Sequence, residues 1–227
     1  MNSILLQVGT GKPRARVLIV DDHPIFREGL TQSLSREEDL TVCGEAENAA
    51  QALDSVPKLA PDLVIVDITL PGKSGLDLIR EIRALHPKLP ILAVSMHDEN
   101  LYASRTLRAG ARGYVMKQES PKVLLQAIRR VLEGGIYVSP KMSSQILESY
   151  SAKSPRSSSS PIEQLSDREF EIFHLVGQGR SNQDIAQHLH LSLKTVAVHE
   201  ASIRRKLSLA NLSDLVRFAV RWQEARQ

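Results

Sequence analysis

Two short apolar segments that each run directly into aspartate constrain this chain more than any other feature. The segment 17–20 is followed by Asp21 and Asp22, and the segment 63–66 is followed by Asp67. Continuous apolar runs of this length are typical of strands buried on both faces, as in parallel sheets. Because such strands present their carboxyl ends at one edge, where α/β sheets bind ligands, we expect the three carboxylates to converge there.

Aspartate is also common at the end of a strand simply because it favours turns. Asp67 alone is therefore weak evidence for a functional site. Three carboxylates in one pocket repel one another unless a cation neutralises them, and an all-oxygen ligand set suits Mg²⁺. A carboxylate beside such a metal can act as the nucleophile toward a phosphoryl donor. The pattern therefore favours a magnesium site with Asp67 as acceptor.

Two further strand-like segments end in groups that bind phosphate. The segment 91–94 is followed by Ser95, and the segment 113–116, which contains Tyr114, is followed by Lys117. A lysine binds a phosphate oxygen as a point charge, and a hydroxyl can donate a hydrogen bond to another oxygen. An acid pair, a single aspartate, a serine and a lysine, each at a strand end and in that order, form a specific combination.

Residues 16 to about 135 resemble the receiver domain of bacterial two-component response regulators. The matching residues are the Asp21-Asp22 pair, Asp67, Ser95, Tyr114 and Lys117. The resemblance implies that Asp67 accepts a phosphoryl group, that Asp22 and Asp67 ligate Mg²⁺, and that Asp21 acts through water. It further implies a metal ligand in the backbone carbonyl of Thr69, and a switch pair, Ser95 and Tyr114, that senses phosphorylation.

Composition is that of a two-domain globular chain. Its 227 residues are 42% hydrophobic and 24% charged, and no apolar run approaches the roughly 18 residues of a membrane span. The amino terminus lacks the pattern of a signal peptide. The single cysteine, Cys43, excludes an internal disulfide, and its strand-like surroundings favour a buried structural thiol. We expect a cytoplasmic protein that does not associate with a membrane.

Alternating strands and helices in the first two-thirds predict an α/β fold. The expected sheet is doubly wound, five-stranded and parallel, with the flavodoxin-like order 2-1-3-4-5. A small all-α domain of four helices should follow. The expected divisions are a flexible lead-in over 1–15, the receiver over 16–140, a Ser/Pro-rich linker over 141–161, and the helical domain over 162–227.

The carboxyl-terminal segment has the start signals of short helices. Ser166 and Ser181 each open a capping box, and a tight turn at 190–192 precedes a third helix over about 193–207. Two short helices joined by such a turn form the helix-turn-helix pattern. Residues 162–227 carry nine basic and eight acidic side chains, so the net charge does not indicate nucleic-acid binding. Evidence for such binding must come from the arrangement of these side chains.

This segment resembles the LuxR-type helix-turn-helix, and with the receiver it gives the whole chain the look of a NarL/FixJ response regulator. The matching runs are 165–169, 179–182, 185–186, 191–192, 194–196 and 205–207, together with His199 and Ile203. The resemblance implies that the third helix enters the major groove of DNA. Phosphate contacts would come from Ser181, Lys194, Thr195, Arg204, Arg205 and Lys206, and base contacts from Ala197, Val198, Ala201 and Ser202.

Glu200 departs from the family pattern, which often has arginine at this position. A carboxylate near phosphate would weaken DNA binding unless it accepts a hydrogen bond from cytosine or pairs with Arg204 at i+4. The remaining alternative is that Glu200 is a solvated residue pointing away from DNA. The sequence leaves all three open.

The resemblance implies a phosphorylation-controlled transcription regulator, the output partner of a sensor histidine kinase, that binds promoter DNA as a homodimer. Phosphorylation of Asp67 should draw in Ser95 and Lys117, allow Tyr114 to move inward, and release the recognition helix. The fourth helix should contribute to dimerisation. Whether the domains dock on each other in the free protein stays open.

Two other functions compete with that of a phosphorylation-controlled transcription regulator. A Mg²⁺-dependent phosphatase with an aspartate nucleophile usually needs a general acid two residues later, where this chain has Thr69, so we expect no enzyme. A dimeric DNA-binding regulator that works without phosphorylation stays open as the alternative.

Overall fold

The computed structural model describes residues 13–144 and 161–225, apart from the side chain of residue 163. Most of the predicted lead-in and most of the predicted linker lie outside the described residues. Residues 140–144, at the start of that linker, are helical. Among the described residues, no helix combines the length and the apolar character that crossing a bilayer demands.

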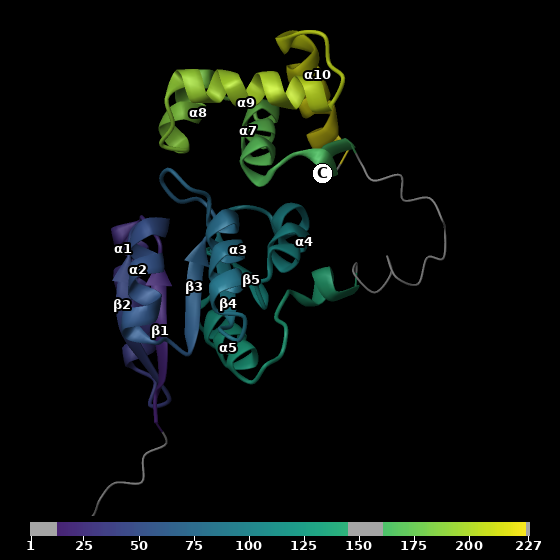
Figure 1. The fold of residues 1–227 in the computed structure, drawn as a ribbon. Helices are drawn as coiled ribbons and strands as arrows, with labels where there is room; N and C mark the ends of the chain where they lie inside the picture. Colours follow the sequence, from purple (N-terminus) through teal and green to yellow (C-terminus); the bar gives the residue numbers. More distant parts are fainter. Residues whose placement is uncertain (1–12, 145–160, 226–227) are drawn as a thin grey trace, which may run out of the picture.

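A five-stranded sheet forms the centre of the first domain (Figure 1). Its strands are β1 (Ala15–Val20), β2 (Leu40–Ala46), β3 (Leu63–Asp67), β4 (Ile91–Ser95) and β5 (Gly113–Met116). All neighbouring pairs are parallel and the order is β2-β1-β3-β4-β5. The predicted sheet and its order are therefore confirmed.

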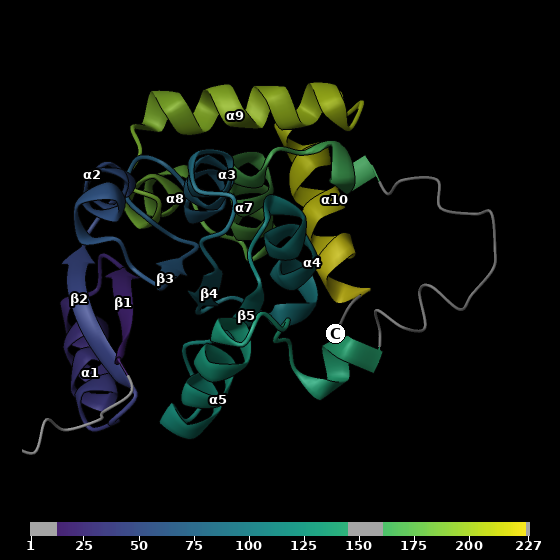
Figure 2. The same cartoon turned by 60° about the horizontal axis from the view of Figure 1, so that its bottom comes forward.

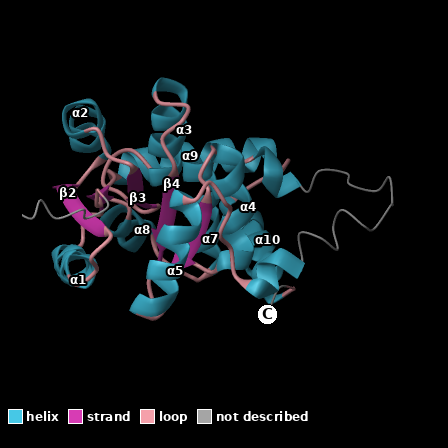
Figure 3. Cartoon of the chain, turned by 90° about the horizontal axis from the view of Figure 1, so that it is seen from below, coloured by secondary structure: helices cyan, strands magenta, loops and turns pink. Residues whose placement is uncertain are grey.

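Helices cover both faces of the sheet, as Figure 3 shows. On one face lie α1 (Pro24–Ser35) and α5 (Pro121–Leu132), and on the other α2 (Ala49–Leu59), α3 (Gly75–Leu85) and α4 (Glu99–Ala109). Every residue of β3 and β4 is buried. The continuous apolar runs in the sequence follow from this double burial, because neither face of these strands meets water.

The second domain consists of a short 3₁₀ helix, η1 (Pro161–Gln164), and helices α7 (Asp167–Gly177), α8 (Asn182–His188), α9 (Leu193–Lys206) and α10 (Leu212–Glu224). Ser166 and Ser181 form the predicted capping boxes, and Ser192 and Asn211 cap α9 and α10. The apolar faces of these helices meet around residues such as Phe173, Ile185 and Ile203.

Helix α7 lies between the receiver and the rest of the second domain (Figures 1 and 2). All of its residues from Asp167 to Val176 are buried, although four of them are acidic or basic and one is histidine. Charged groups are almost never fully buried unless they are paired. The partners of these side chains therefore show how the domains dock.

Candidate functional site

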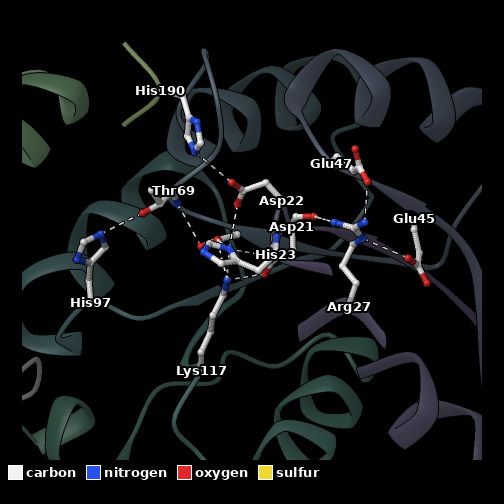
Figure 4. Close-up of polar contacts among 11 residues, drawn as sticks. Asp21, Asp22, His23, Arg27, Glu45, Glu47, Thr69, His97, Lys117 and His190 are labelled. Atoms are coloured by element: carbon white, nitrogen blue, oxygen red, sulfur yellow. Dashed lines mark hydrogen bonds and ion pairs between the residues drawn. The ribbon is translucent and has the colours of Figure 1, made fainter. Parts of the chain in front are cut away.

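The acidic edge of the receiver lies where β1, β3 and β5 end. The side chains of Asp21 and Asp67 are each 2% exposed, and the ammonium of Lys117 reaches both. Its Nζ lies 2.6 Å from Asp21 Oδ2 and 2.7 Å from Asp67 Oδ2. The ends of β1, β3 and β5 thus meet at the ammonium group of Lys117 (Figure 4).

His23 also belongs to this edge. Its Nδ1 lies 3.0 Å from Asp22 Oδ1, 3.1 Å from Asp21 Oδ1 and 3.7 Å from Asp67 Oδ2. Potential ligand atoms of Asp21, Asp22, His23 and Asp67 all lie within 4.8 Å of one another. From the sequence, a metal-ligand role for His23 is possible, but a place beside the ligands or at the surface is favoured because Mg²⁺ prefers oxygen.

The charge balance of the pocket favours a further cation. Three carboxylates face one lysine, and burial, together with repulsion from Asp21, raises the pKa of Asp67 to about 7 even though Lys117 opposes the shift. A divalent cation beside Asp67 would counter both effects. The acidic pocket is typical of Mg²⁺ sites, because carboxylate and carbonyl oxygens are the ligands that this ion prefers.

The loop after β3 lies directly against Asp67. The backbone N–H of Thr69 donates to Asp67 Oδ1 over 3.2 Å, and Thr69 Oγ1 lies 3.1 Å from His97 Nε2. The loop returns so closely that a Cβ on Gly75 would lie 1.9 Å from the carbonyl oxygen of Asp67. Only glycine can begin α3 there, and this close approach fixes the loop over the acceptor.

Ser95 and Tyr114, the predicted switch pair, meet at His97 rather than at Asp67. Ser95 Oγ accepts the backbone N–H of His97 over 3.2 Å, and Tyr114 Oη donates to the backbone carbonyl of His97 over 2.7 Å. Both side chains are fully buried. In this structure the Tyr114 ring occupies the inward position, and its predicted movement on phosphorylation stays a prediction.

Arg27, which sequence reasoning did not assign, supports the acid pair from behind. Its Nη1 donates to the backbone carbonyl of Asp21 over 2.6 Å, while Nη2 and Nε reach Glu47 and Glu45 at 2.7 and 3.2 Å. This fixes the backbone at the end of β1 (Figure 4). A single arginine in an amphipathic helix carries no local signal for such a contact.

Arg105 of α4 carries the largest set of contacts between the two domains. Its guanidinium donates to the backbone carbonyls of Ile162 and Leu165, at 2.7 and 3.0 Å, and lies 3.2 Å from Asp167 Oδ1. It also stacks 4.1 Å from the centre of the Phe170 ring. Asp167 has a second ion pair with Arg80 of α3, so the amino terminus of α7 sits between two arginines of the receiver.

Two further contacts bring the second domain close to the acidic edge. Arg168 Nη2 donates to the backbone carbonyl of Gly72, in the loop after β3, over 2.7 Å. His190, in the turn between α8 and α9, places Nε2 3.5 Å from Asp22 Oδ2 (Figure 4). The second domain therefore docks over the loops that surround Asp67. No local pattern in the sequence predicts this contact.

Helix α9 lies on the side of the second domain away from the receiver (Figures 1 and 2). The side chains of Lys194, Ala197, Val198, Ala201 and Arg205 are exposed, and those of Thr195 and Arg204 are partly exposed. Ser181 is exposed at the start of α8. Docking uses α7 and the α8–α9 turn, so the receiver does not cover the recognition helix, contrary to the expectation that phosphorylation must release it.

Three polar side chains of α9 turn inward. Glu200 is only 5% exposed and accepts a hydrogen bond of 2.9 Å from Asn182 Nδ2, so it is neither a solvated residue nor a base reader here. Ser202 Oγ donates to Glu169 Oε1 over 2.7 Å, and Lys206 Nζ reaches Glu169 Oε2 over 2.6 Å. The last two were predicted DNA contacts, and in this structure their polar ends are occupied by α7.

Family models match both parts of the chain. Residues 17–129 match the response regulator receiver domain, and residues 163–219 match the luxR family of bacterial regulatory proteins. The oxygen regulatory protein NreC of Staphylococcus carnosus is 33% identical over 91% of this chain and 97% of its own length. The response regulator GacA of Pseudomonas viridiflava is 36% identical over 91% of this chain and 95% of its own length.

Solved structures of RcsB from Salmonella are similar along almost the whole chain. One has a TM-score of 0.63 and 30% identity, covering 92% of this chain and 98% of RcsB. Another, at a TM-score of 0.60 and 30% identity over 91% of this chain and 98% of RcsB, holds that protein bound to a promoter in the presence of the phosphomimetic BeF₃⁻. By its two domains and by these relatives, the chain belongs to the NarL/FixJ family of two-component response regulators.

Proposed function

We propose that this protein controls transcription through phosphorylation of Asp67. One observation carries the proposal. Asp67 lies buried at 2.7 Å from Lys117, beside an acid pair, in a chain that also presents an exposed recognition helix. The first arrangement suits phosphoryl acceptance and the second suits DNA binding, and members of this family are DNA-binding response regulators, which are in general not enzymes. We assign the chain no catalytic turnover of its own.

The geometry supports the following acceptor reaction. An oxygen of Asp67 attacks the phosphorus of a phosphohistidine on a sensor histidine kinase, the N–P bond breaks, and an O–P bond forms. Asp22, Asp67 and the carbonyl of Thr69 would hold Mg²⁺, with Asp21 acting through water, and the ion would neutralise phosphoryl oxygens. Lys117 already touches Asp67 and can pair with one such oxygen, while Ser95 can donate to another.

The DNA contacts are proposed from exposure and charge. Lys194, Thr195, Arg204, Arg205 and Ser181 would contact phosphates, and Ala197, Val198 and Ala201 would face base edges. Small apolar groups favour contacts with thymine methyl groups and DNA shape over bidentate guanine reading. Ser202 and Lys206 can join only after leaving Glu169.

We infer that the active species is a homodimer on paired half-sites about 34 Å apart. Leu212 and Val216 stand one turn apart on α10 and are 45% and 39% exposed. An exposed apolar pair on this helix supports its predicted part in dimerisation. Because its target would be promoter DNA, we place the protein in the cytoplasm.

Replacing the acceptor tests the proposal directly. Wild-type protein incubated with Mg²⁺ and a small phosphodonor should gain one phosphoryl group by intact-mass spectrometry, and Asp67→Asn should gain none. An Asp67→Asn protein that still accepts a phosphoryl group would overturn the assignment. Asp54→Asn, at an exposed carboxylate of α2, is the matched control and should be labelled as wild type is.

A second function, DNA binding that does not depend on phosphorylation, is favoured by the exposure of α9 in the docked molecule. Docking leaves the recognition surface open, so no chemical step is needed to uncover it. A titration with Mg²⁺ and BeF₃⁻ separates the two functions. A phosphorylation-controlled regulator changes its DNA affinity on titration, whereas an independent one keeps the same affinity.

A further inference from the structure

His97 is the residue at which the contacts of the acidic edge meet. Its backbone N–H donates to Ser95 Oγ, its backbone carbonyl accepts from Tyr114 Oη, and its ring Nε2 lies 3.1 Å from Thr69 Oγ1. Thr69 in turn donates its backbone N–H to Asp67. His97 thus contacts both Ser95 and the loop beside Asp67, and Figure 4 shows its contact with Thr69 of that loop.

The same ring faces the DNA-binding domain. It stacks on Tyr102 of α4 with a centroid distance of 4.5 Å and an interplanar angle of 17°, and it meets the edge of His174 of α7 at 6.0 Å. Tyr102 also packs against Phe170 of α7 at 5.2 Å. Such stacked and edge-to-face pairs hold rings in defined positions.

His174 is itself fixed within the second domain. Gln178 and Gln223 lie 3.0 Å from its two ring nitrogens, and Gln223 also donates to its backbone carbonyl over 2.7 Å. A displacement of His97 therefore reaches an imidazole that is tied to both α7 and α10. The contacts run without a gap from the acceptor to the carboxyl-terminal helix.

We propose that His97 is a positioning residue that transmits the state of Asp67 to the docking of the DNA-binding domain. The inference rests on the proposed function and deepens it by naming the path. A phosphoryl group on Asp67 would draw the Ser95 hydroxyl and the Thr69 loop, both of which His97 now contacts, away from their present positions. When those hydrogen bonds break, the ring loses the support that keeps it against Tyr102 and His174.

The state of the ring agrees with this role. Burial, aided by nearby positive charge, lowers the pKa of His97 to about 4, so the imidazole is neutral at physiological pH. A neutral ring has one donor and one acceptor nitrogen, and it can either donate to Thr69 or accept from it. It also packs on Tyr102 without burying a charge.

The fluorescence of the chain's only tryptophan can report on the contact between His97 and His174. Trp222 of α10 lines the same cavity of about 610 Å³ as His97 and His174, between α4 and the second domain. Its fluorescence should change when the domains shift relative to each other. Bound BeF₃⁻ can be counted separately by ¹⁹F NMR, so binding at Asp67 and the response of the second domain are measured independently.

The variants separate the hydrogen bond from the ring. His97→Phe keeps an aromatic ring and loses the bond to Thr69, Thr69→Val loses the partner hydroxyl, and His97→Gln keeps an amide that can reach Thr69. His86→Phe, at the carboxyl end of α3 and outside this cavity, is the matched control. All are studied as full-length protein with Mg²⁺ and BeF₃⁻.

Wild type, His86→Phe and, in large part, His97→Gln should show a saturable Trp222 response. His97→Phe should bind BeF₃⁻ with less than half of that response, and Thr69→Val should show less than half of that response per bound BeF₃⁻ counted by ¹⁹F NMR. The ratio of DNA affinities with and without BeF₃⁻ should fall at least about five-fold in both, the lower end of common allosteric couplings. The fluorescence response of the double variant should be no smaller than that of either single variant, because both substitutions remove the same contact.

Three different results would overturn the inference. If His97→Phe and Thr69→Val bind BeF₃⁻ and respond as wild type does, His97 does not transmit the signal, while phosphoryl acceptance stands. If wild type binds no BeF₃⁻, the proposed function fails and the inference falls with it. Additive losses in the double variant would also contradict a shared contact.

Discussion

The acidic edge of the receiver and the outer face of α9 are built in opposite ways. At the edge, Asp21, Asp67 and Lys117 are almost fully buried and each charged group lies within 3 Å of an opposite one. On α9, Lys194 and Arg205 stand in solvent, and the polar ends of Ser202 and Lys206 are turned back onto Glu169. The charged groups of the edge are already held against one another, whereas Lys194 and Arg205 on the outer face of α9 stand in solvent.

This difference has an energetic consequence. Buried charges interact strongly and are costly to leave unpaired, so single changes at the edge should have large effects. Exposed charges are screened by solvent and salt, so single changes on α9 should have small and salt-dependent ones.

The largest effect is expected from removing the lysine of the edge. Lys117→Met leaves Asp21 and Asp67 without their shared cation, and breaking such a buried pair costs about 3–5 kcal/mol of unfolding free energy. Mg²⁺ should restore much of this loss, because it supplies the missing positive charge. Urea unfolding with and without Mg²⁺ measures both terms.

Lys73→Met is the matched control for that experiment. Lys73 also forms an ion pair, with Glu81, but its side chain is 45% exposed, and exposed pairs contribute less than about 1 kcal/mol. Equal losses for the two variants would contradict the distinction between buried edge and exposed surface. A Lys117→Met protein that is insensitive to Mg²⁺ would contradict the metal site.

The next effect concerns the connection between the two regions. Arg105→Ala removes two hydrogen bonds, an ion pair and a stacked ring contact from the interface with α7, and should weaken docking by about 2–3 kcal/mol. Small-angle X-ray scattering should show a larger radius of gyration. Arg108→Ala, at an exposed arginine of the same helix, should leave the radius unchanged, and an unchanged radius in both would disprove the role of Arg105.

A smaller effect is expected on the outer face of α9. Lys194→Ala should weaken DNA binding by about 1 kcal/mol and lower the slope of log affinity against log salt by about 1, because one phosphate contact is lost. Binding isotherms at several salt concentrations give both values. Arg217→Ala, an exposed arginine of α10, serves as control, and a salt slope that stays the same in Lys194→Ala would remove Lys194 from the interface.

The smallest effect concerns the inward-turned side chains. Burial would raise the pKa of Glu169, but hydrogen bonds from Lys206, Ser202 and the Ser166 backbone outweigh it and lower the pKa to about 2. Since the folded pKa lies below the ordinary 4.5, the stabilisation is complete above about pH 4.5 and is lost as pH falls toward 2.

Unfolding by urea between pH 5 and pH 2 measures that loss, which we expect to be on the order of 1 kcal/mol because the partner Lys206 is partly exposed to solvent. Ser202→Ala should make the loss smaller, because it removes one of the bonds that lower the pKa. A pH profile identical to that of wild type would show that Ser202 does not hold Glu169 in solution and is free for DNA.

The acidic edge was predictable because its residues are tied to strand ends. Asp21, Asp67, Ser95 and Lys117 each follow an apolar run, and parallel topology alone brings such ends together. Arg105 and Arg168 were not predictable, since their partners lie on elements far away in the sequence and an arginine on a helix surface carries no local signal.

The burial of Glu200 follows from its helical spacing, although its charge favours an exposed position. It stands four residues after Val196 and three before Ile203, so helical spacing itself places it on the buried face with them. Its charge suggested an outward position. In the structure Asn182 offers the hydrogen bond that makes its burial possible.

The most direct test of the account measures DNA binding by the full-length protein. Genomic promoter fragments are titrated with wild-type and Asp67→Asn protein, each with Mg²⁺ alone and with Mg²⁺ and BeF₃⁻, at fixed salt. We expect BeF₃⁻ to change the affinity of the wild type and to leave that of Asp67→Asn unaltered. Equal affinities for the wild type with and without BeF₃⁻, while ¹⁹F NMR shows the ion bound, would contradict phosphorylation control.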